Sequence, residues 1–382
     1  MNKVLEKIKG DRAIWMVVIF LSIFSLLAVY SSTGTLAYKY RSGNTEYYII
    51  KHFIIMLLGL GLMLLASRIK YTYYSRISQL ALWVAAPLLL LTLVRGTNIN
   101  EASRWLTLPI INISFQSSDF AKLALIMYVA RMLTKKQETI KDFKEAFMPV
   151  LVPVLIITML ILPANLSTAA ILFVTCAILM FIGGVNIKYL AAFGGIGLLS
   201  LLLFVFVASK MPESRVSVWG KRVTTFVTNT GDTYQTQQAK IAIASGGAIG
   251  KMPGNSTQRN FLPHAYSDFI YAIIIEEYGF VGGFFVLLLY LILFYRAIKI
   301  SKKSPGTFGA LLVAGLSFSL VFQGMINMAV AVNIFPVTGQ PLPLISMGGT
   351  SLWFSSLAIG IILSVSRKVE EDELNGRAIT TS

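Results

Sequence analysis

About ten long apolar stretches, separated by polar segments, constrain the fold of this chain more than any other feature of its sequence. A bilayer core about 30 Å thick is crossed by a helix of about 20 apolar residues. The stretches do not alternate in polarity, which excludes a membrane-spanning strand barrel. They begin near Ile14, Ile49, Gln79, Ser118, Ala146, Ser167, Tyr189, Asp268, Phe308 and Ser351. The sequence therefore predicts an all-α polytopic membrane protein with about ten transmembrane helices.

The composition agrees with this class of protein. With 55% hydrophobic residues, 13% charged residues and a mean hydropathy of +0.71, the chain cannot fold as an ordinary water-soluble domain. No shift in composition divides it, so we predict a single integral membrane domain over residues 1–382. A long extracytoplasmic loop is expected at 209–267, between the seventh and eighth helices, and a short polar tail at 367–382. A diverged inverted repeat stays open.

Basic residues predict the orientation, because cytoplasmic loops collect Lys and Arg. They cluster before the first apolar stretch and again after the second, fourth, sixth, eighth and last. Both termini are therefore expected in the cytoplasm, with the first stretch retained as an uncleaved helix. The clusters include Lys3, Lys7, Arg12, Arg68, Lys70, Arg76, Lys135, Lys136, Lys141, Lys144, Lys188, Arg296, Lys299, Lys302, Lys303, Arg367 and Lys368.

The long loop is itself basic, which the orientation rule tolerates in long loops. Such a surface suits an anionic ligand such as a pyrophosphate, or it meets anionic lipid headgroups, and both interpretations stay open. The net charge of +16 thus indicates a membrane, and no helix-turn-helix, finger or RNA-binding signature supports a nucleic-acid partner. The basic residues are Lys210, Arg215, Lys221, Arg222, Lys240, Lys251 and Arg259.

Cysteine and histidine give little support for a metal or redox site. Cys176 is the only cysteine, and it lies inside an apolar stretch. His52 and His264 are the only histidines, too few for a histidine-built zinc site. The sequence indicates no cofactor and leaves a divalent cation open.

Ionisable residues within or beside membrane helices are costly, so each is a functional hypothesis. Asp119 and Lys122 are three residues apart and share one helical face, which predicts an ion pair or a substrate contact. Glu276 and Glu277 are adjacent and point to different faces. A helix from Asp268 to Glu276 rises about 12 Å, so Glu276 is expected too deep to act at the same atom, and we assign this pair a supporting role.

Asp268 is the acid whose position is most informative. It follows a long polar loop and precedes a strongly apolar stretch, which places a carboxylate at the membrane surface, where a lipid-linked substrate can meet it.

Two further segments are unusual beside a membrane. Residues 101–106 set Arg104 and Trp105 at the outer interface, although an interfacial Trp is more often an anchor. Residues 336–351 interrupt helix with three prolines and contain Gly348 and Gly349, whose amides could cradle an anion. Ser346 and Thr350 could equally cap a helix. Such irregular backbone is tolerated only inside the protein or around a polar cavity.

Together these residues resemble the SEDS proteins, the RodA/FtsW family of peptidoglycan glycosyltransferases that polymerise lipid II. The resemblance covers nearly the whole chain. The run from Leu26 to Ser32 and the overall layout are more similar to the division branch, FtsW, than to the elongation branch, RodA. The other motifs that carry it are Arg104-Trp105, residues 116–122, Tyr234-Gln235, residues 242–251, Gln258, residues 262–272, residues 276–279 and residues 338–351.

The chain departs from the family pattern at several positions. His264 replaces the usual Glu after Leu-Pro, and Tyr266 replaces the usual His before Ser/Thr-Asp. Asn165 stands where the family frequently has Asp, and Met347 replaces a common Tyr. The family's catalytic Asp falls on Asp268, so that carry-over survives, whereas support roles of the lost Glu and Asp do not.

The resemblance implies a specific chemistry. Lipid II carries its sugar on an α-linked pyrophosphate, which is already a good leaving group, so a single general base acting on the acceptor 4-hydroxyl suffices and inversion gives a β-1,4 glycan. Asp268 is the predicted base. The predicted substrate-binding residues, the basic ones for pyrophosphate or carboxylate, are Arg104, Trp105, Lys122, Lys251, Gln258, Arg259, Ser346, Gly348, Gly349 and Ser351.

The resemblance also implies a cellular setting: the bacterial inner membrane at the division septum, with a class B penicillin-binding transpeptidase (FtsI-like) and other divisome proteins as partners besides lipid. Three alternatives stay open. An elongation polymerase would use the same chemistry. A lipid II flippase would concentrate polar residues at mid-membrane. A non-catalytic divisome scaffold would not need Asp268.

Overall fold

Ten helices form the body of the computed structural model, which describes residues 9–41, 43–95, 97–99, 102–108, 113–209 and 234–380. They correspond one to one with the ten predicted stretches, so the predicted membrane fold is confirmed. Seven candidate spans are long and apolar enough to cross a membrane, α8 is a shorter apolar helix, α9 is apolar over Ile187–Leu203, and α6 carries Asp119, Lys122 and Arg131. The helices are α2 (Arg12–Ser32), α4 (Thr45–Arg68), α5 (Tyr71–Arg95), α6 (Ser117–Lys135), α7 (Met148–Ile161), α8 (Leu166–Ile182), α9 (Ile187–Ser209), α12 (Ile270–Lys303), α13 (Thr307–Ala331) and α14 (Thr350–Thr380).

A small antiparallel sheet was not expected. The sequence predicted a loop between the third and fourth helices, whereas the structure forms three strands there in the order β1-β2-β3, with Trp105 paired to Gln116. Strands of three to seven residues are too short to be detected by a search for 20-residue apolar stretches. The elements are β1 (Thr97–Ile99), β2 (Ala102–Leu108) and β3 (Ile113–Gln116).

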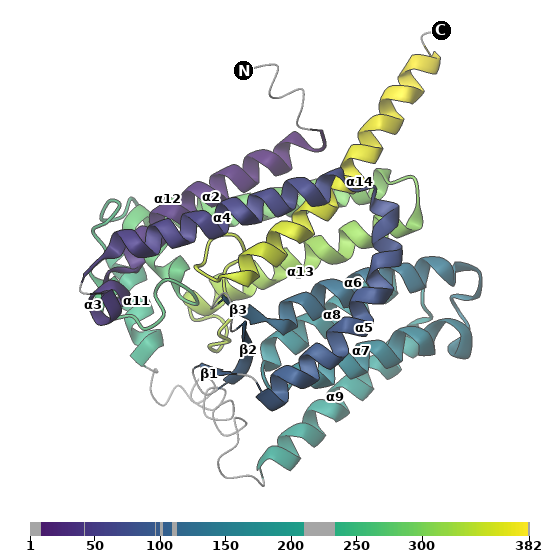
Figure 1. The fold of residues 1–382 in the computed structure, drawn as a ribbon, viewed down its shortest axis with the longest axis horizontal. Helices are drawn as coiled ribbons and strands as arrows, with labels where there is room; N and C mark the ends of the chain where they lie inside the picture. Colours follow the sequence, from purple (N-terminus) through teal and green to yellow (C-terminus); the bar gives the residue numbers. More distant parts are fainter. Residues whose placement is uncertain are drawn as a thin grey trace.

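Short helices complete the described chain. Two of them, α3 and α11, lie at the end of the bundle opposite the chain termini (Figure 1). The short helices are α3 (Gly34–Arg41), η1 (Gln137–Thr139), the π-helical η2 (Phe143–Phe147), α11 (Tyr234–Gly246) and η3 (Gln258–Asn260).

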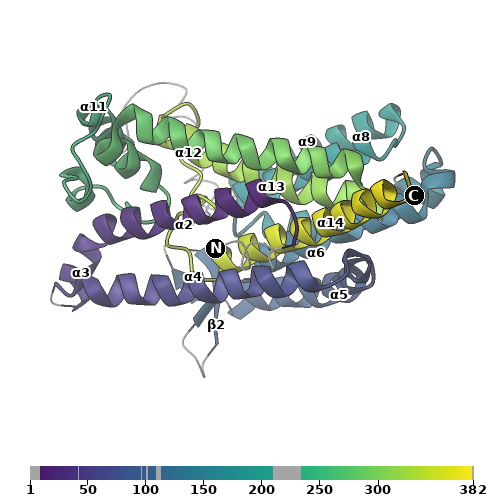
Figure 2. The same ribbon diagram turned by 90° about the horizontal axis from the view of Figure 1, so that it is seen from above.

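Small residues let α4 and α14 pack with their backbones close together. A Cβ added at Gly360 would lie 2.5 Å from the Met63 carbonyl oxygen, and one at Gly59 would lie 2.6 Å from Leu352 Cδ2. In a membrane, where lipid removes most of the hydrophobic drive between helices, such close van der Waals contact holds helices together. Figure 2 shows α2 and α4 side by side on one face of the bundle.

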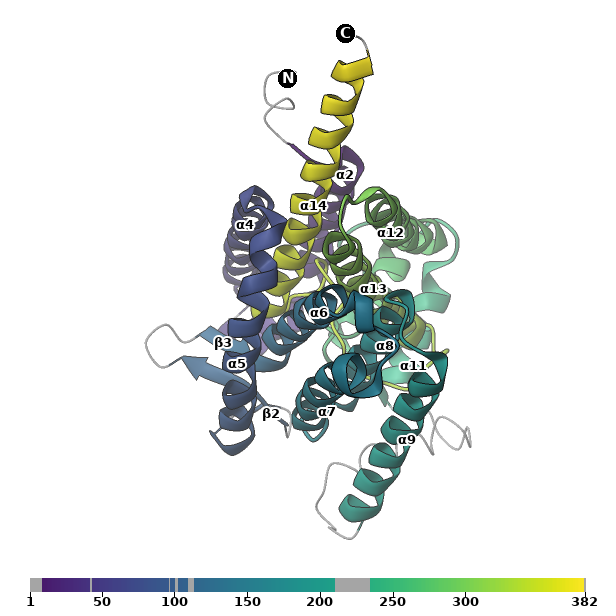
Figure 3. The same cartoon turned by 90° about the vertical axis from the view of Figure 1, so that its right-hand side faces the viewer.

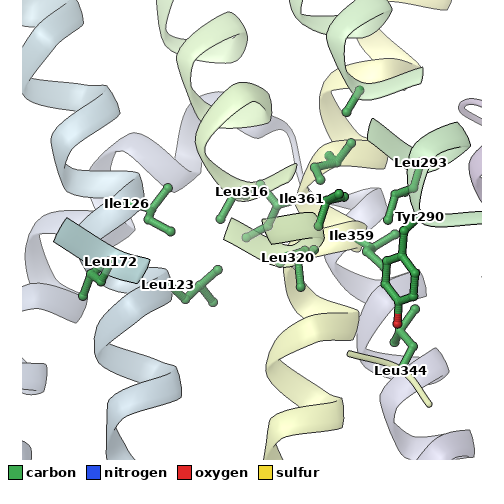
Figure 4. Packing of buried hydrophobic residues seen from close by; sticks show 14 of the residues in the cluster. Leu123, Ile126, Leu172, Tyr290, Leu293, Leu316, Leu320, Leu344, Ile359 and Ile361 are labelled. Carbon is green, nitrogen blue, oxygen red and sulfur yellow. The ribbon is translucent and has the colours of Figure 1, made fainter. Parts of the chain in front are cut away.

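The apolar core lies among α6, α12, α13 and α14. Leu123 and Ile126 of α6 face Leu316 and Leu320 of α13, as Figure 4 shows. Tyr290 of α12 is buried in the same core, and its hydroxyl donates to the Pro343 carbonyl oxygen. The irregular segment at 332–349 is thereby fastened to the core.

The start of α2 is bonded to both α12 and α14. Asp11 caps α2 through Ala13 N, pairs with Arg296 of α12, and is tied to α14 because its own amide donates to Ser366 Oγ at 2.9 Å. Both ends of the chain therefore lie on one side of the bundle, and α14 projects beyond it (Figures 1 and 3).

Candidate active site

Asp268 lies in a turn, two residues before α12 begins at Ile270. The eighth apolar stretch was expected to become helical near Asp268 itself, and the difference leaves its half-buried side chain outside the helix. Three hydrogen bonds fix this turn. Asn327 Nδ2 donates to the Asp268 carbonyl at 2.8 Å, Ser346 Oγ donates to the Ser267 carbonyl at 2.6 Å, and Met347 N donates to the Tyr266 carbonyl at 2.9 Å.

The proline-rich segment, residues 336–351, supplies two of these three bonds through Ser346 and Met347, and it is itself held by the helices around it. Asn327 Nδ2 also donates to the Gln340 carbonyl at 2.7 Å, and Gln323 Nε2 donates to the Pro341 carbonyl at 3.0 Å. Ser346 Oγ accepts from Leu342 N at 2.8 Å. The irregular backbone is thus packed inside the protein, as expected for non-helical chain at membrane depth.

Lys122 of α6 is joined to the Asp268 turn through α13. Lys122 Nζ donates to Gln323 Oε1 at 2.7 Å, and Asn327, four residues further along the same helical face, binds the Asp268 carbonyl. Lys122 also lies 3.6 Å from Asp119 Oδ1, which confirms the ion pair predicted from their spacing. Lys122 and the Asp268 turn are therefore both bonded to one helix, α13.

A cavity of about 20 Å³ lies between α6, α13 and α14, large enough for one water molecule. Asp119, Lys122, Ser319 and Ser351 line it. Asp119 is 4% exposed, and its Oδ2 and the Ser319 hydroxyl have no hydrogen-bond partner among the described residues. Ser351, a predicted substrate residue, lines this polar pocket beside Asp119.

A second charged cluster surrounds Glu276, the carboxylate that was expected too deep to act at the same atom as Asp268. Glu276 is fully buried, and Lys251 Nζ donates to its Oε1 at 2.7 Å. Ser256 and Thr257 also donate to it, at 2.5 and 2.9 Å. These groups reach Glu276 because residues 247–259 fold back onto α12. Lys251 therefore neutralises a buried carboxylate.

Glu277, the next residue of α12, binds the same loop through Ser256. Its Oε1 accepts from the Ser31 hydroxyl of α2 and from Ser256 N at 3.3 Å. Arg259 lies nearby, with Nη1 3.4 Å from the Ser31 carbonyl. Each carboxylate therefore binds the loop at 247–259, which gives the supporting role predicted for this glutamate pair a structural basis.

Glycines allow the loop to interlock with α12. Gly279 interrupts the helix at φ 68°, ψ −171°, and a Cβ there would lie 2.2 Å from the Ala248 carbonyl oxygen. The break releases backbone groups to the loop, since Phe280 N donates to Gly247 O and Lys251 N donates to Glu276 O, both at 2.9 Å. Only glycine fits both the backbone angle and the close approach.

The remaining predicted residues are distributed around these two clusters. Trp105 is half-buried in β2, Gln258 N lies within 3.4 Å of Glu276, and Gly348 accepts from Ser351 N at 2.9 Å. Gly349 has a φ of 47°, and the Thr350 hydroxyl accepts from Gln116 N, so Thr350 holds β3.

Some predictions fall outside what the structure describes. The side chain of Arg104 and residues 210–233, which include Lys210, Arg215, Lys221 and Arg222, lie outside the described residues. Within the described part, no group of three or more His, Cys, Asp and Glu side chains could hold a metal ion.

Sequence reasoning missed Gln323 and Asn327, which hold Lys122 and Asp268. Both are buried polar residues four apart in an otherwise apolar span, and that spacing is the signal that could have found them.

The fold and the site define a class: a multi-span membrane protein with a half-buried carboxylate in a turn, a buried acid–cation pair and a loop packed onto a broken helix. The FtsW/RodA/SpoVE model, described as "Cell cycle protein", matches residues 11–371. The chain belongs to this family.

Curated relatives and solved structures agree with this assignment. The chain is 32% identical over 375 residues to "Probable peptidoglycan glycosyltransferase FtsW" of Trichlorobacter lovleyi, covering 96% of each chain. It is 31% identical to "Stage V sporulation protein E" of Bacillus subtilis over 95% of this chain and 98% of that one.

Two solved structures share the fold. One, described as "Structural coordination of polymerization and crosslinking by a peptidoglycan synthase complex", has a TM-score of 0.74 at 24% identity and covers 94% of this chain and 98% of that chain. The other, the rod shape determining protein RodA of Thermus thermophilus, has a TM-score of 0.69 at 23% identity and covers 95% and 98%.

Proposed function

We propose that this chain is a peptidoglycan glycosyltransferase that polymerises lipid II, with Asp268 as its general base. The observation that carries the proposal is the placement of Asp268: a carboxylate in a turn outside α12, its backbone bound by Asn327 and its neighbour Ser267 bound by Ser346. A base must be held still relative to the hydroxyl it deprotonates. The names of the curated relatives support the same activity.

The reaction needs few groups. Asp268 takes the proton of the acceptor 4-hydroxyl while that oxygen attacks the anomeric carbon of the donor, and the bond to the pyrophosphate breaks. Undecaprenyl pyrophosphate leaves with the bonding electrons, and attack from the opposite face inverts the α-linkage into a β-1,4 bond. Cations near the pyrophosphate stabilise the charge that develops on it.

The candidate cations differ in their surroundings. Lys251 is paired with the buried Glu276, so its first role is to hold the loop. Lys122 shares its charge with Asp119 at 3.6 Å and keeps a hydrogen bond to Gln323. Arg259 is half-buried beside Ser31. We assign the pyrophosphate contacts to Lys122, Arg259 and Arg104, with Trp105, Gln258, Gly348 and Gly349 on the substrate side. Ser346, also predicted there, is buried and holds the Asp268 turn.

The cellular setting follows from the family and is part of the proposal. The chain acts in the bacterial cytoplasmic membrane, with both termini in the cytoplasm, at the division septum. A class B transpeptidase is its partner, a pairing supported by the similar fold in a peptidoglycan synthase complex that couples polymerization and crosslinking. An elongation role with the same chemistry is the second candidate, favoured by the fold shared with RodA.

The test is polymerisation of lipid II by the purified chain with its cognate transpeptidase, scored as glycan chains on a gel. The same preparation in vesicles is assayed for lipid II translocation. Glycan without translocation is the expected result. Translocation without glycan indicates a flippase, and neither activity from a folded, partner-bound protein indicates a scaffold.

A further inference from the structure

His52 is a fully buried histidine that the proposed chemistry does not use. It lies in α4, a helix whose other side chains mostly face outward, yet it is 0% exposed. A buried polar ring in a membrane bundle is costly unless it is bonded, so its partner indicates why it is there.

The partner is Ser25 of α2. His52 Nε2 lies 2.7 Å from Ser25 Oγ, and that hydroxyl donates its one proton to the Ile345 carbonyl at 2.8 Å. The proton between histidine and serine must therefore come from the ring, which assigns the Nε2–H tautomer. His52 thus orients a hydroxyl whose bond ends on the proline-rich segment.

The backbone of the proline-rich segment is strained at Leu344, next to the Ile345 carbonyl that Ser25 binds. Leu344 has a φ of 64°, a left-handed conformation that a leucine adopts only when its surroundings enforce it. Tyr290 holds the carbonyl of Pro343 on one side of Leu344, and Ser25 holds the carbonyl of Ile345 on the other. The two bonds bracket the strained residue and fix its direction.

Ser346, the residue after Ile345, binds the turn that carries the proposed base. Ser346 Oγ donates to the Ser267 carbonyl at 2.6 Å, and Ser267 precedes Asp268. We propose that His52 is a positioning residue for glycan transfer: through Ser25 it fixes the Ile345 carbonyl, and through Ser346 it holds the Asp268 turn. This inference rests on the proposed role of Asp268.

The kinetic test compares His52→Leu, His52→Gln and Ser25→Ala with the native chain. His52→Leu and Ser25→Ala lower kcat per folded molecule about tenfold or more, with the KM for lipid II within twofold, because the base is misplaced while the substrate site stays. His52→Gln, whose amide N–H can donate to Ser25, recovers most of the loss.

Ser364→Ala is the matched control. Ser364 is also a buried serine, and its hydroxyl donates to the Ile69 carbonyl, which has no part in the bonds that hold the Asp268 turn. We expect native kcat from this variant. Equal losses in Ser364→Ala and Ser25→Ala would reduce the effect to general packing, and native kcat in Ser25→Ala would overturn the proposal.

A second readout does not depend on activity. Hydrogen–deuterium exchange of the peptide spanning residues 262–272 becomes faster in Ser25→Ala and His52→Leu but not in Ser364→Ala. Unchanged exchange in Ser25→Ala overturns the hold of His52 on the turn. If Asp268→Ala still makes glycan, the role of Asp268 as base fails, and this exchange result still decides whether His52 and Ser25 hold the turn at residues 266–268.

Discussion

At the scale of single residues, charges that hold the fold can be separated from charges that meet the substrate. Asp119 and Lys122 were identified from their spacing of three in the sequence, because residues three apart are neighbours on one helical face and opposite charges there can pair. Asp268 was identified from its position between polar and apolar chain. The spacing of Gln323 and Asn327 could have marked them as polar residues of one helical face, but the groups that they bind depend on how α13 packs.

Lys122 is expected to serve both the fold and the reaction. Lys122→Met leaves Asp119 buried without its partner and lowers the free energy of unfolding by about 3 kcal/mol. Adding Asp119→Asn recovers most of that stability, but polymerisation stays lost because the cation is gone. Thermal unfolding and glycan synthesis measured on both variants check this, and an active double variant would make Lys122 purely structural.

Lys251 is expected to behave in the opposite way. Lys251→Met leaves Glu276 buried and unpaired, and the loop at 247–259 loosens. The double variant with Glu276→Gln removes the unpaired charge and recovers polymerisation to within about fivefold of native, since Lys251 acts through the loop. Continued inactivity of a folded double variant would instead place Lys251 on the substrate.

At the scale of elements, helices were predictable and their interruptions were not. All ten apolar stretches became helices, because a run of about 20 apolar residues has few other stable forms in a bilayer. The loop that returns onto α12 was missed, since Gly279 looks like any glycine until its φ of 68° is known. The contacts of Glu276 with Lys251, Ser256 and Thr257 were missed for the same reason.

Gly279→Ala is expected to break the interlock. The added Cβ meets the Ala248 carbonyl at 2.2 Å in a backbone conformation that alanine disfavours, which costs about 3 kcal/mol. The control is Gly61→Ala in α4, where a Cβ meets no atom within 4 Å. Thermal unfolding checks the pair, and equal melting temperatures for the two variants would contradict the interlock.

At the scale of the whole molecule, the basic residues predicted that both termini lie in the cytoplasm. This orientation requires the two ends of the chain to lie on the same side of the bundle. Asp11 joins the start of α2 to Arg296 and Ser366, so the two ends of the chain lie on one side. Helix α3, which carries the 79% exposed Tyr38, lies toward the other end (Figure 1).

Cysteine labelling in intact cells tests this orientation. An impermeant maleimide is expected to label Tyr38→Cys and to leave Lys9→Cys and Asn375→Cys unlabelled until the membrane is permeabilised. The native Cys176 is buried and does not interfere. Labelling of either terminal position in intact cells would reverse the predicted topology.

The role of Asp268 as the base is decided by comparing lipid II binding and glycan synthesis in one preparation of Asp268→Asn, with its transpeptidase present. Asparagine keeps the size of the side chain and the backbone bonds at residues 266–268 but cannot accept the proton. We expect native binding and a loss of polymerisation of about a thousandfold. Native polymerisation by this variant would refute the assignment of Asp268 and place the base elsewhere.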